Sequence, residues 1–490
     1  MKGTALTLGL VSTPREIARE LATSTLLEKV PIASSLASLF SNAGFTLALV
    51  GGPVRDAILG RLGNDLDFTT NARPNETKKI LKAWADSIWE TGAVFGTIAG
   101  KKGDVTVEVT TYRSENYDPQ SRKPEVNFGE SIEGDLSRRD FTINCLALEL
   151  TTTPPKFIDL FDGVDDLAKK LLRAPGDPDV LFGDDPLRMM RAARFASQLD
   201  FAVDPTIIES MKRMAERITI VSAERVHDEL IKLLMSKSPR VGLTLMVETG
   251  LAAFVLPELP KLKLEVDEHH HHKDVYEHTL TVLEQAIALE DRLGGPNLVI
   301  RLAALLHDIG KPKTRELIPG GGVSFHHHEV VGSRMAKERL RALRFDNQTI
   351  SDVAQLVFLH LRFHGYAGGE WTDSAVRRYV RDADGLLEHL HVLTRADCTT
   401  RNQRKASALA ATYDSLETRI ELLMQEEELN SIRPDLDGNA IMAILDIPAS
   451  QIVGKAYNYL LELRLENGPL GEERAKEALL KWWDENGKKK

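Results

Sequence analysis

The sequence predicts an α+β protein in which a small mixed sheet with helices comes first and all-α domains follow. Between about residues 31 and 150, short apolar runs alternate with stretches of helical periodicity. After Asp185 the apolar residues recur almost throughout at helical spacing, for example at 275–289. The chain has 490 residues, which is enough for about three domains of ordinary size.

Changes in this pattern divide the chain into five predicted segments. Pro257 and Pro260, followed by charged residues up to Lys273, mark one boundary, and residues 401–405 mark another. The predicted segments are an N-terminal extension, an α/β domain, a helical neck and body, a second helical domain and a helical tail, at 1–30, 31–175, 176–262, 263–402 and 403–490.

Composition and charge exclude several classes of protein. The chain is 42% hydrophobic and 27% charged, as is usual for globular proteins. It has no apolar run long enough for a membrane span, and its N-terminus lacks the features of a secretory signal. Cys145 and Cys398 form no disulfide framework or metal-ligand spacing, so we expect a cytoplasmic protein without a membrane partner. A net charge of −10 argues against nucleic acid binding over the whole surface but allows a groove lined by arginines.

A glycine pair and two aspartates form the first candidate site. Gly51 and Gly52 follow the apolar run 47–50, where a strand would end and the backbone would approach another group closely. Asp65 and Asp67 alternate with apolar residues, so a strand would carry both carboxylates on one face. Two carboxylates held together repel each other unless a cation lies between them, which indicates a Mg²⁺ site. The alternative is a turn whose aspartates cap a neighbouring helix.

A third carboxylate lies on the predicted strand 104–109. Valines flank Glu108 and would face the opposite side of the sheet. If this strand lies beside the one with Asp65 and Asp67, three carboxylates meet. Two Mg²⁺ ions there could activate a 3′-hydroxyl and stabilise a leaving pyrophosphate. The alternative for Glu108 is an ordinary solvent-facing strand residue.

Two arginine-rich segments supply candidates for binding phosphate and base. Arg138, Arg139 and Asp140 place two guanidinium groups beside a carboxylate, which suits triphosphate oxygens and a ribose hydroxyl. A helix is predicted to open just after Asp185, which would be its N-cap. Asp185 and Arg188 together offer an acceptor and a donor for the Watson–Crick edge of a base. Three arginines share one face of this helix, and their mutual repulsion calls for an anion: Arg188, Arg191 and Arg194.

Taken together, these segments resemble the class II tRNA nucleotidyltransferase and bacterial poly(A) polymerase family. The resemblance runs from about residue 45 to residue 234, over four ordered motifs: Gly51-Gly52 to Asp67, Arg138 to Asn144, Asp185-x-x-Arg188, and Glu224 to Lys232. It implies a nucleotidyltransferase palm at 31–175 and a neck and body at 176–262 with a nucleotide-template helix and an RNA-binding surface. One departure is Asp184, where the family usually has glutamate.

The resemblance also implies roles for individual residues. Asp65 and Asp67 would carry Mg²⁺, with Glu108 as the third catalytic carboxylate. The helix with Asp185 and Arg188 would act as a protein template for CTP and ATP. The RNA partner would be the 3′ end and acceptor arm of tRNA, recognised by shape and backbone contacts. Nucleotide binding would involve Gly51, Gly52, Arg55, Asp56, Arg138, Arg139, Asp140, Asp185, Arg188, Arg191 and Arg194.

Two features favour addition of C, C and A to tRNA over poly(A) synthesis. Poly(A) polymerases of this class usually carry a basic stretch after the first palm helix, whereas residues 92–98 resemble those of CCA-adding enzymes. Enzymes that add only the two cytidines lack a flexible loop before the double-arginine motif. This chain keeps a long polar loop at 113–135, with Arg122, Lys123 and Pro124. We therefore predict complete CCA addition, with poly(A) addition as the alternative.

A second candidate site lies in the second helical domain. His278, the pair His307-Asp308 and, much later, Asp397 supply nitrogen and oxygen ligands in an order that suits a divalent metal that activates water. Over about residues 274–398 the chain resembles the HD phosphohydrolase superfamily. The resemblance implies a transition metal such as Mn²⁺ or Ni²⁺, or Mg²⁺.

Further histidines and two alternatives accompany this resemblance. His328 and His360 fall where some HD proteins bind a second metal, and His364 could replace either one. The domain would then act on phosphate esters or cyclic phosphates, and HD phosphohydrolysis could be the main activity. The alternative is an HD domain that binds metal and serves as a scaffold facing RNA.

Two other segments carry open interpretations. The histidine run 269–272 is predicted to be a polar loop. In the helical tail, Trp482 and Trp483 could serve packing or RNA contact. In similar enzymes this region contacts the tRNA elbow or a neighbouring subunit, so an oligomer is compatible with the sequence.

Overall fold

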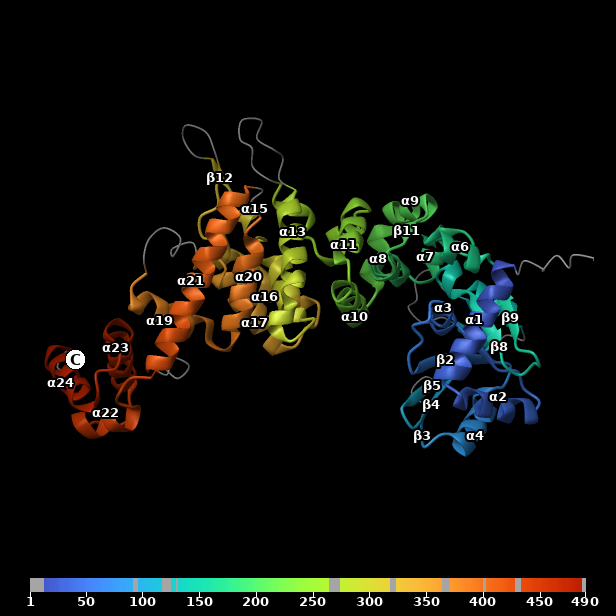
Figure 1. The fold of residues 1–490 in the computed structure, drawn as a ribbon, viewed down its shortest axis with the longest axis horizontal. Helices are drawn as coiled ribbons and strands as arrows, with labels where there is room; N and C mark the ends of the chain where they lie inside the picture. Colours follow the sequence, from blue (N-terminus) through green and yellow to red (C-terminus); the bar gives the residue numbers. More distant parts are fainter. Residues whose placement is uncertain are drawn as a thin grey trace, which may run out of the picture. The chain divides into compact units, whose positions relative to one another are not determined.

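The chain of this computed structural model divides into two compact units, Met1–Val255 and Leu256–Lys490, called unit 1 and unit 2 here (Figure 1). The structure describes residues 13–90, 96–116, 125–128, 131–263, 274–317, 323–363, 371–399, 402–427 and 433–486. Several positions named above lie outside the described residues: 92–95, 117–124 with Arg122, Lys123 and Pro124, the histidines 269–272, and His364.

Unit 1 is built on a seven-stranded mixed sheet, which confirms the prediction of an α+β fold. Its strands lie in the order β3, β4, β5, β2, β1, β8, β9. Strands β2 and β5 pair in parallel, and the other neighbours pair antiparallel. The strands span Ala48–Val50 (β1), Asp65–Thr70 (β2), Ser87–Trp89 (β3), Thr97–Lys102 (β4), Val105–Thr111 (β5), Leu146–Glu149 (β8) and Lys156–Asp159 (β9).

One face of this sheet forms the main core of unit 1 together with several helices. They include α1 (Pro14–Lys29), α2 (Ile32–Asn42), α3 (Gly52–Ile58) and α4 (Pro74–Trp84). Phe68 and Val107 point into this core because side chains alternate along each strand. Helix α1 begins with a capping box between Thr13 and Glu16 and buries Ala18, Ala22 and Leu26. The predicted N-terminal extension therefore contributes a helix to this core.

The remaining elements of unit 1 are mostly helical. Helices α3 and α5 precede and follow the sheet strands that carry the site, and the predicted loop 113–135 contains a pair of short antiparallel strands, β6 and β7. A parallel two-stranded bridge joins β10 to β11. The bounds are Gly52–Ile58 (α3), Arg113–Asn116 (β6), Glu125–Phe128 (β7), Ile132–Ser137 (α5), Gly163–Lys169 (α6), Leu171–Leu172 (β10), Pro178–Asp184 (α7), Leu187–Leu199 (α8), Ala202–Val203 (β11), Pro205–Met214 (α9), Ala223–Leu234 (α10), Pro239–Glu248 (α11) and Ala252–Val255 (α12).

Unit 2 is helical apart from one small hairpin among its described residues, β12 with β13. Helix α13 begins at Val275 as the periodicity predicts, because Asp274 caps it through the Tyr276 N–H. The bounds are Val275–Ala288 (α13), Leu298–Leu306 (α14), Lys311–Thr314 (α15), Glu316–Leu317 (β12), Val323–Ser324 (β13), His328–Ala342 (α16), Asn347–Leu359 (α17), Asp373–Ala383 (α19), Leu387–Asp397 (α20), Gln403–Glu427 (α21), Gly438–Leu445 (α22), Gln451–Asn467 (α23) and Glu472–Asn486 (α24).

The last three helices form a core of their own. Ile441, Leu460 and Leu479 are buried in it, and both tryptophans of the tail, Trp482 and Trp483, pack against it. The ring of Trp482 stacks on that of Tyr459 with centroids 5.7 Å apart. Packing is therefore the observed role of these tryptophans. None of the described helices is long and apolar enough to cross a membrane.

A glycine contact between α8 and α11 leads to a test of the packing. A Cβ atom on Gly242 would overlap the Ala193 carbonyl oxygen and lie 2.6 Å from Ser197 Oγ. We expect Gly242→Ala to lower the free energy of unfolding by about 2 kcal/mol, because the added methyl group would overpack the contact and force α8 and α11 apart. Gly183→Ala is the control, since its Cβ would meet only Met214 Cε at 3.9 Å. Thermal unfolding of the two variants measures the difference, and equal midpoints would contradict it.

Candidate functional site

Three predicted carboxylates lie on one face of the sheet in unit 1. Strands β2 and β5 are parallel neighbours, and their register places Asp67 opposite Glu108. Asp65 lies two residues before Asp67, so its side chain points to the same face. The intervening Leu66 and Phe68 are buried on the other face. The predicted side-by-side arrangement of the two strands is confirmed.

Neighbouring charges act on Asp67. Desolvation raises the pKa of its carboxyl group, Arg139 opposes this, and the charges of Glu108 and Asp65 raise the pKa further. A divalent cation would relieve this repulsion, and carboxylate oxygens are suitable ligands for Mg²⁺. The three carboxylates share a face without converging as closely as the groups of unit 2 described below.

A pocket of about 360 Å³ opens beside Asp67. Its walls come from the glycine pair, the double-arginine segment, helix α8 and the first turn of α10. The lining residues that the sequence predicts are Gly51, Gly52, Arg55, Asp67, Arg138, Arg139, Asp140, Asp185, Arg188, Arg191 and Arg194. Four other residues also line the pocket and were not predicted to bind nucleotide, although the first and the last lie in the motifs that carry the family resemblance: Asn144, Leu187, Phe195 and Arg225. Three predicted residues are not part of the lining: Asp56, Asp65 and Glu108.

The glycine pair allows an arginine to approach the backbone. Gly51 has φ +74°, in the left-handed region that favours glycine. A Cβ atom at this position would lie 2.8 Å from Nη1 of Arg139. Asp135, which is buried, accepts from Arg139 at 3.1 Å and from Arg138 at 2.8 Å. The double arginine is therefore positioned by a glycine on one side and a buried carboxylate on the other.

A chain of polar contacts crosses the floor of the pocket. Arg55 donates to Asn144 Oδ1 at 2.7 Å and pairs with Asp56 at 2.9 Å. Asn144 donates to Asp140 Oδ1 at 2.9 Å, and Arg191 Nε donates to the other oxygen of Asp140 at 2.7 Å. Burial alone would raise the pKa of Asp140, but the Arg191 charge and these hydrogen bonds lower it to about 2. Asp140 therefore stays ionised at the centre of the network.

The arginines of α8 find their anions within the protein. Arg191 pairs with Asp140, and Arg194 Nε donates to Glu229 Oε2 at 2.5 Å. The anions predicted for this face of the helix are thus two carboxylates from other elements of the protein. The guanidinium of Arg194 also lies 4.1 Å from the ring centroid of Phe195.

Asp185 and Arg188 line the pocket but do not pair with each other. Arg188, only 8% exposed, donates to the carbonyl oxygens of Leu181 at 3.1 Å and Arg138 at 2.6 Å. Asp185 instead accepts from Arg225 at 2.7 Å. The two residues predicted to act together as donor and acceptor therefore have different partners within the protein. Arg225 could not be assigned to Asp185 from the sequence, because the two residues are 40 positions apart.

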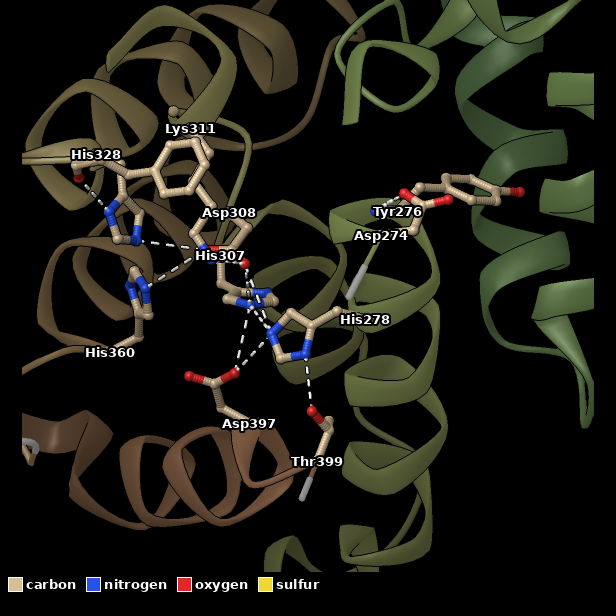
Figure 2. Close-up of polar contacts among 12 residues, drawn as sticks. Asp274, Tyr276, His278, His307, Asp308, Lys311, His328, His360, Asp397 and Thr399 are labelled. Carbon is tan, nitrogen blue, oxygen red and sulfur yellow. Dashed lines mark hydrogen bonds and ion pairs between the residues drawn. The ribbon is translucent and has the colours of Figure 1, made fainter. Parts of the chain in front are cut away.

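In unit 2 six predicted ligands gather at one point from five helices or their ends. Figure 2 shows the side chains pointing toward one another. His278 lies in α13, and Asp397 is the last residue of α20. The other four lie at helix ends, directly after α14 or α17 or at the start of α16: His307, Asp308, His360 and His328.

These ligands form two groups of three whose ligand atoms lie within 4.8 Å of one another. His278, His307 and Asp397 form one group, and His278 Nε2 lies 2.9 Å from Asp397 Oδ1. The buried residues Asp308, His328 and His360 form the other. Asp308 joins the two groups, because one of its oxygens lies 3.2 Å from His307 and the other 3.3 Å from His328.

The histidine rings are oriented by hydrogen bonds at Nδ1. In three of them Nδ1–H donates to a carbonyl oxygen three residues earlier, at 2.8, 2.8 and 2.6 Å for His307, His328 and His360. His278 differs, because its Nδ1 contacts the hydroxyl of Thr399 at 3.0 Å. A carbonyl only accepts, so in the neutral form of these three rings the proton lies on Nδ1 and Nε2 carries the free electron pair. This tautomer is the one that binds a metal through Nε2.

Charge and burial also fit a cation. The Nε2 atoms of His328 and His360 are buried without a hydrogen bond in the described part of the chain. Burial and the neighbouring His307 lower the pKa of His360 to about 4, so this ring is neutral at pH 7. Burial would raise the pKa of Asp308, but His307 and Lys311 hold it well below its usual range. Imidazole nitrogens and carboxylate oxygens gathered in this way are a suitable donor set for one or two divalent metals.

Family models match three parts of the chain. Residues 47–173 match the poly A polymerase head domain, and residues 200–262 match a model described as the probable RNA and SrmB-binding site of polymerase A. Residues 275–402 match the HD domain. The pocket and the histidine cluster therefore lie in regions of the chain that match different family models.

Curated relatives match the N-terminal half. The CCA-adding enzyme of Levilactobacillus brevis is 40% identical over 243 residues, which are 49% of this chain and 59% of the relative. The CCA-adding enzyme of Streptococcus suis is 41% identical over 237 residues, 48% of this chain and 56% of the relative. The N-terminal half of the chain is therefore similar to CCA-adding enzymes over the region that matches the poly A polymerase head domain. The match spans less than two thirds of the length of these relatives.

Solved structures share the fold of this chain over most of its length. The Bacillus stearothermophilus CCA-adding enzyme in complex with CTP has a TM-score of 0.65 at 22% identity, over 94% of this chain and 99% of that one. The Thermotoga maritima CCA-adding enzyme complexed with tRNA has a TM-score of 0.61 at 19% identity, over 94% and 98%. At these identities the likeness concerns the fold.

The ionised state of Asp140 in the head domain gives a pH-dependent prediction. The pKa of Asp140 in the folded protein, about 2, lies below the ordinary aspartate pKa of 3.8. The ionised carboxylate therefore contributes its full stabilisation at pH values above 3.8 and loses it as the pH falls towards 2. Asp140→Asn should lower the free energy of unfolding by about 2–3 kcal/mol at pH 7 and by roughly half as much at pH 3. Urea unfolding at both pH values measures the difference. Asp165→Asn, at an exposed position, is the control, and a pH-independent loss would contradict the expectation.

The contact between Thr399 and His278 gives a prediction for the HD domain. We expect Thr399→Val to weaken Mn²⁺ binding about 10- to 100-fold, because His278 loses the partner that orients its ring. Thr399→Ser keeps the hydroxyl and should bind Mn²⁺ as the wild type does. The control is Thr394→Val, since the Thr394 hydroxyl donates to the Leu390 carbonyl within α20. Titration calorimetry on metal-stripped protein measures affinity and stoichiometry, and equal affinities for both valine variants would refute the role.

Proposed function

We propose that this protein adds C, C and A to the 3′ end of tRNA, using CTP and ATP without a nucleic acid template. The observation that carries the proposal is the pocket beside Asp67, in which arginines and the aspartates Asp67, Asp140 and Asp185 line a space next to the face that carries three carboxylates. This combination suits a nucleoside triphosphate whose phosphates lie near a metal site. The relatives that match the N-terminal half at 40% and 41% identity are CCA-adding enzymes, which supports the same proposal.

In the proposed mechanism the reacting groups of the two substrates lie beside the carboxylates of the sheet. Asp65, Asp67 and Glu108 would hold Mg²⁺, which supplies activation of the primer hydroxyl and stabilisation of the leaving pyrophosphate. Desolvation raises the pKa of Asp67, and the charges of Glu108 and Asp65 add to this rise, so a bound cation would favour its ionised form. The exposed positions of all three side chains leave them accessible to the substrates.

The pocket walls would bind the nucleotide. Arg138 and Arg139 would contact triphosphate oxygens, and the Gly51-Gly52 turn allows the phosphates to approach the backbone. The Arg55, Asp140 and Arg191 network would fix the ribose side of the pocket without binding solvent anions itself. Asp185 would accept from the exocyclic amino group that cytosine and adenine share.

For RNA, we propose that residues 176–262 form the neck and body that contact the acceptor arm. The sequence boundaries at 31–175, 263–402 and 403–490 belong to the same proposal, as palm, HD domain and tail. A reducing compartment such as the cytoplasm suits this proposal, because Cys145 and Cys398 are both unpaired thiols and Cys145 is buried.

A second function is supported by the six-ligand cluster of the HD domain. We propose phosphohydrolysis of a phosphate ester or cyclic phosphate there, with Mn²⁺, Ni²⁺ or Mg²⁺ held by His278, His307, Asp308 and Asp397. His328 and His360 would bind a second ion with Asp308, since their Nε2 atoms point to it at 3.3 and 3.9 Å. The metal would supply a water molecule of lowered pKa as the nucleophile. Lys311, whose Nζ lies 2.6 Å from Asp308, would stand beside the phosphate.

One pair of variants tests both proposals. Asp67→Asn should reduce nucleotide addition to tRNA lacking its 3′ end by at least about a thousandfold, since a catalytic carboxylate is lost. It should leave phosphate release with Mn²⁺ unchanged. Asp308→Asn should show the reverse pattern, and each variant is the matched control for the other. Single-nucleotide gel mapping with CTP, ATP or both, together with phosphate release from 2′,3′-cyclic nucleotides, measures the two activities.

The wild-type products decide between the remaining functions. Two additions with CTP, and one further adenosine with both nucleotides, are the expected result. A growing ladder of adenosines would make the protein a poly(A) polymerase. Absence of phosphate release under all metals would overturn the hydrolase and leave the HD domain as a scaffold.

A further inference from the structure

Two side chains from different helices meet at the wall of the nucleotide pocket. Arg225, in the first turn of α10, donates from Nη2 to Asp185 Oδ2 at 2.7 Å. The other oxygen of Asp185 accepts from the Leu187 N–H at 3.1 Å, at the start of α8. The carboxylate is therefore fixed at both oxygens, by the start of α8 and by α10.

Arg188, which the sequence groups with Asp185, binds the protein backbone and not Asp185. Its guanidinium is buried and donates to two backbone carbonyl oxygens. The side chain of Arg225 is 53% exposed and that of Asp185 is 20% exposed, and both line the pocket. Arg225 is thus the guanidinium that faces both the carboxylate and the space where a base would lie.

A carboxylate held in this way can select between bases. It offers about four acceptor positions, of which the Arg225 and Leu187 donors use two. Cytosine and adenine carry an exocyclic amino donor, whereas uracil and guanine carry a carbonyl oxygen at the corresponding position. An ionised, fixed carboxylate accepts from the first pair and repels the second.

We propose that Arg225 is a positioning residue that holds Asp185 for the selection of bases with an exocyclic amino group. The inference rests on the proposed nucleotidyl transfer, and it assigns part of the selectivity to a residue outside α8. Arg225 acts through Asp185 and reaches the pocket from the segment 200–262, which matches the RNA-binding family model.

Further contacts between the two helices make this positioning rigid. Glu229, one turn after Arg225, accepts from Arg194 at 2.5 Å. Another turn on, the Lys232 carbonyl accepts from Gln198 at 3.3 Å. These three positions of α10 share one face because they are four and three residues apart. Helix α10 therefore holds α8 along its length, and a shift of α10 would move Asp185.

The test is nucleotide discrimination by Arg225→Gln. On tRNA lacking its 3′ end, the ratio of kcat/KM for CTP to that for UTP should fall at least about tenfold, because Asp185 is free to turn. Arg225→Lys keeps a cation beside Asp185 and should recover most of the ratio. The matched control is Arg15→Gln, since Arg15 is 54% exposed and pairs with Asp162 at 2.6 Å away from the pocket.

Each outcome decides the inference. If Arg225→Gln keeps the wild-type ratio while the wild type adds cytidine, the inference is wrong and the proposed function stands. If the wild type adds no nucleotide, the proposed function is wrong, and the inference fails with it. Equal losses in Arg225→Gln and Arg225→Lys without a change in the ratio would assign Arg225 a merely structural role. Arg225→Met provides a second neutral variant should the glutamine variant not fold.

Discussion

Burial of positive charge along α8 is the constraint on which the site of unit 1 depends. A guanidinium taken out of water without a partner costs several kcal/mol, so each arginine must meet an acceptor. Arg191 meets Asp140, and Arg194 meets Glu229. These acceptors come from the segment before β8 and from α10, so neutralising the charge also fixes three parts of the chain against one another. The pocket lies where these parts meet.

In unit 2 the buried charge that needs partners is negative. Asp308 is 1% exposed, and its charge is offset by Lys311 and by the surrounding imidazoles. Because carbonyl oxygens fix Nδ1 of three histidines, the electron pairs of Nε2 point to the same centre. One unit therefore presents an arginine-rich cavity that suits an anion, and the other presents a carboxylate and imidazole cluster that suits a cation. A nucleoside triphosphate and a divalent metal are the ligands that we propose for these two sites.

Local patterns predicted much of the fold. Alternation along 104–109 and around Asp65 and Asp67 placed three carboxylates on one face, and the structure has both strands with this alternation. The helical spacing at 275–289 predicted a helix that the structure also has, with Asp274 as its cap. These predictions succeed because side-chain direction follows from the backbone period and caps act within a few residues. The contribution of α1 to the core did not follow from its sequence, since packing partners are distant in the chain.

The sequence by itself determined which chemical groups the site contains: the carboxylates of β2 and β5, the arginines of α8, and the histidines and aspartates at the helix ends of unit 2. The tertiary structure decided which of these groups are paired. In the folded protein Arg188 donates to backbone carbonyl oxygens, Asp185 accepts from Arg225, and Nδ1 of His278 forms a hydrogen bond with Thr399. The physical reason is that residue type and spacing set charge and local direction, whereas a hydrogen-bond partner depends on distances between elements that only packing establishes.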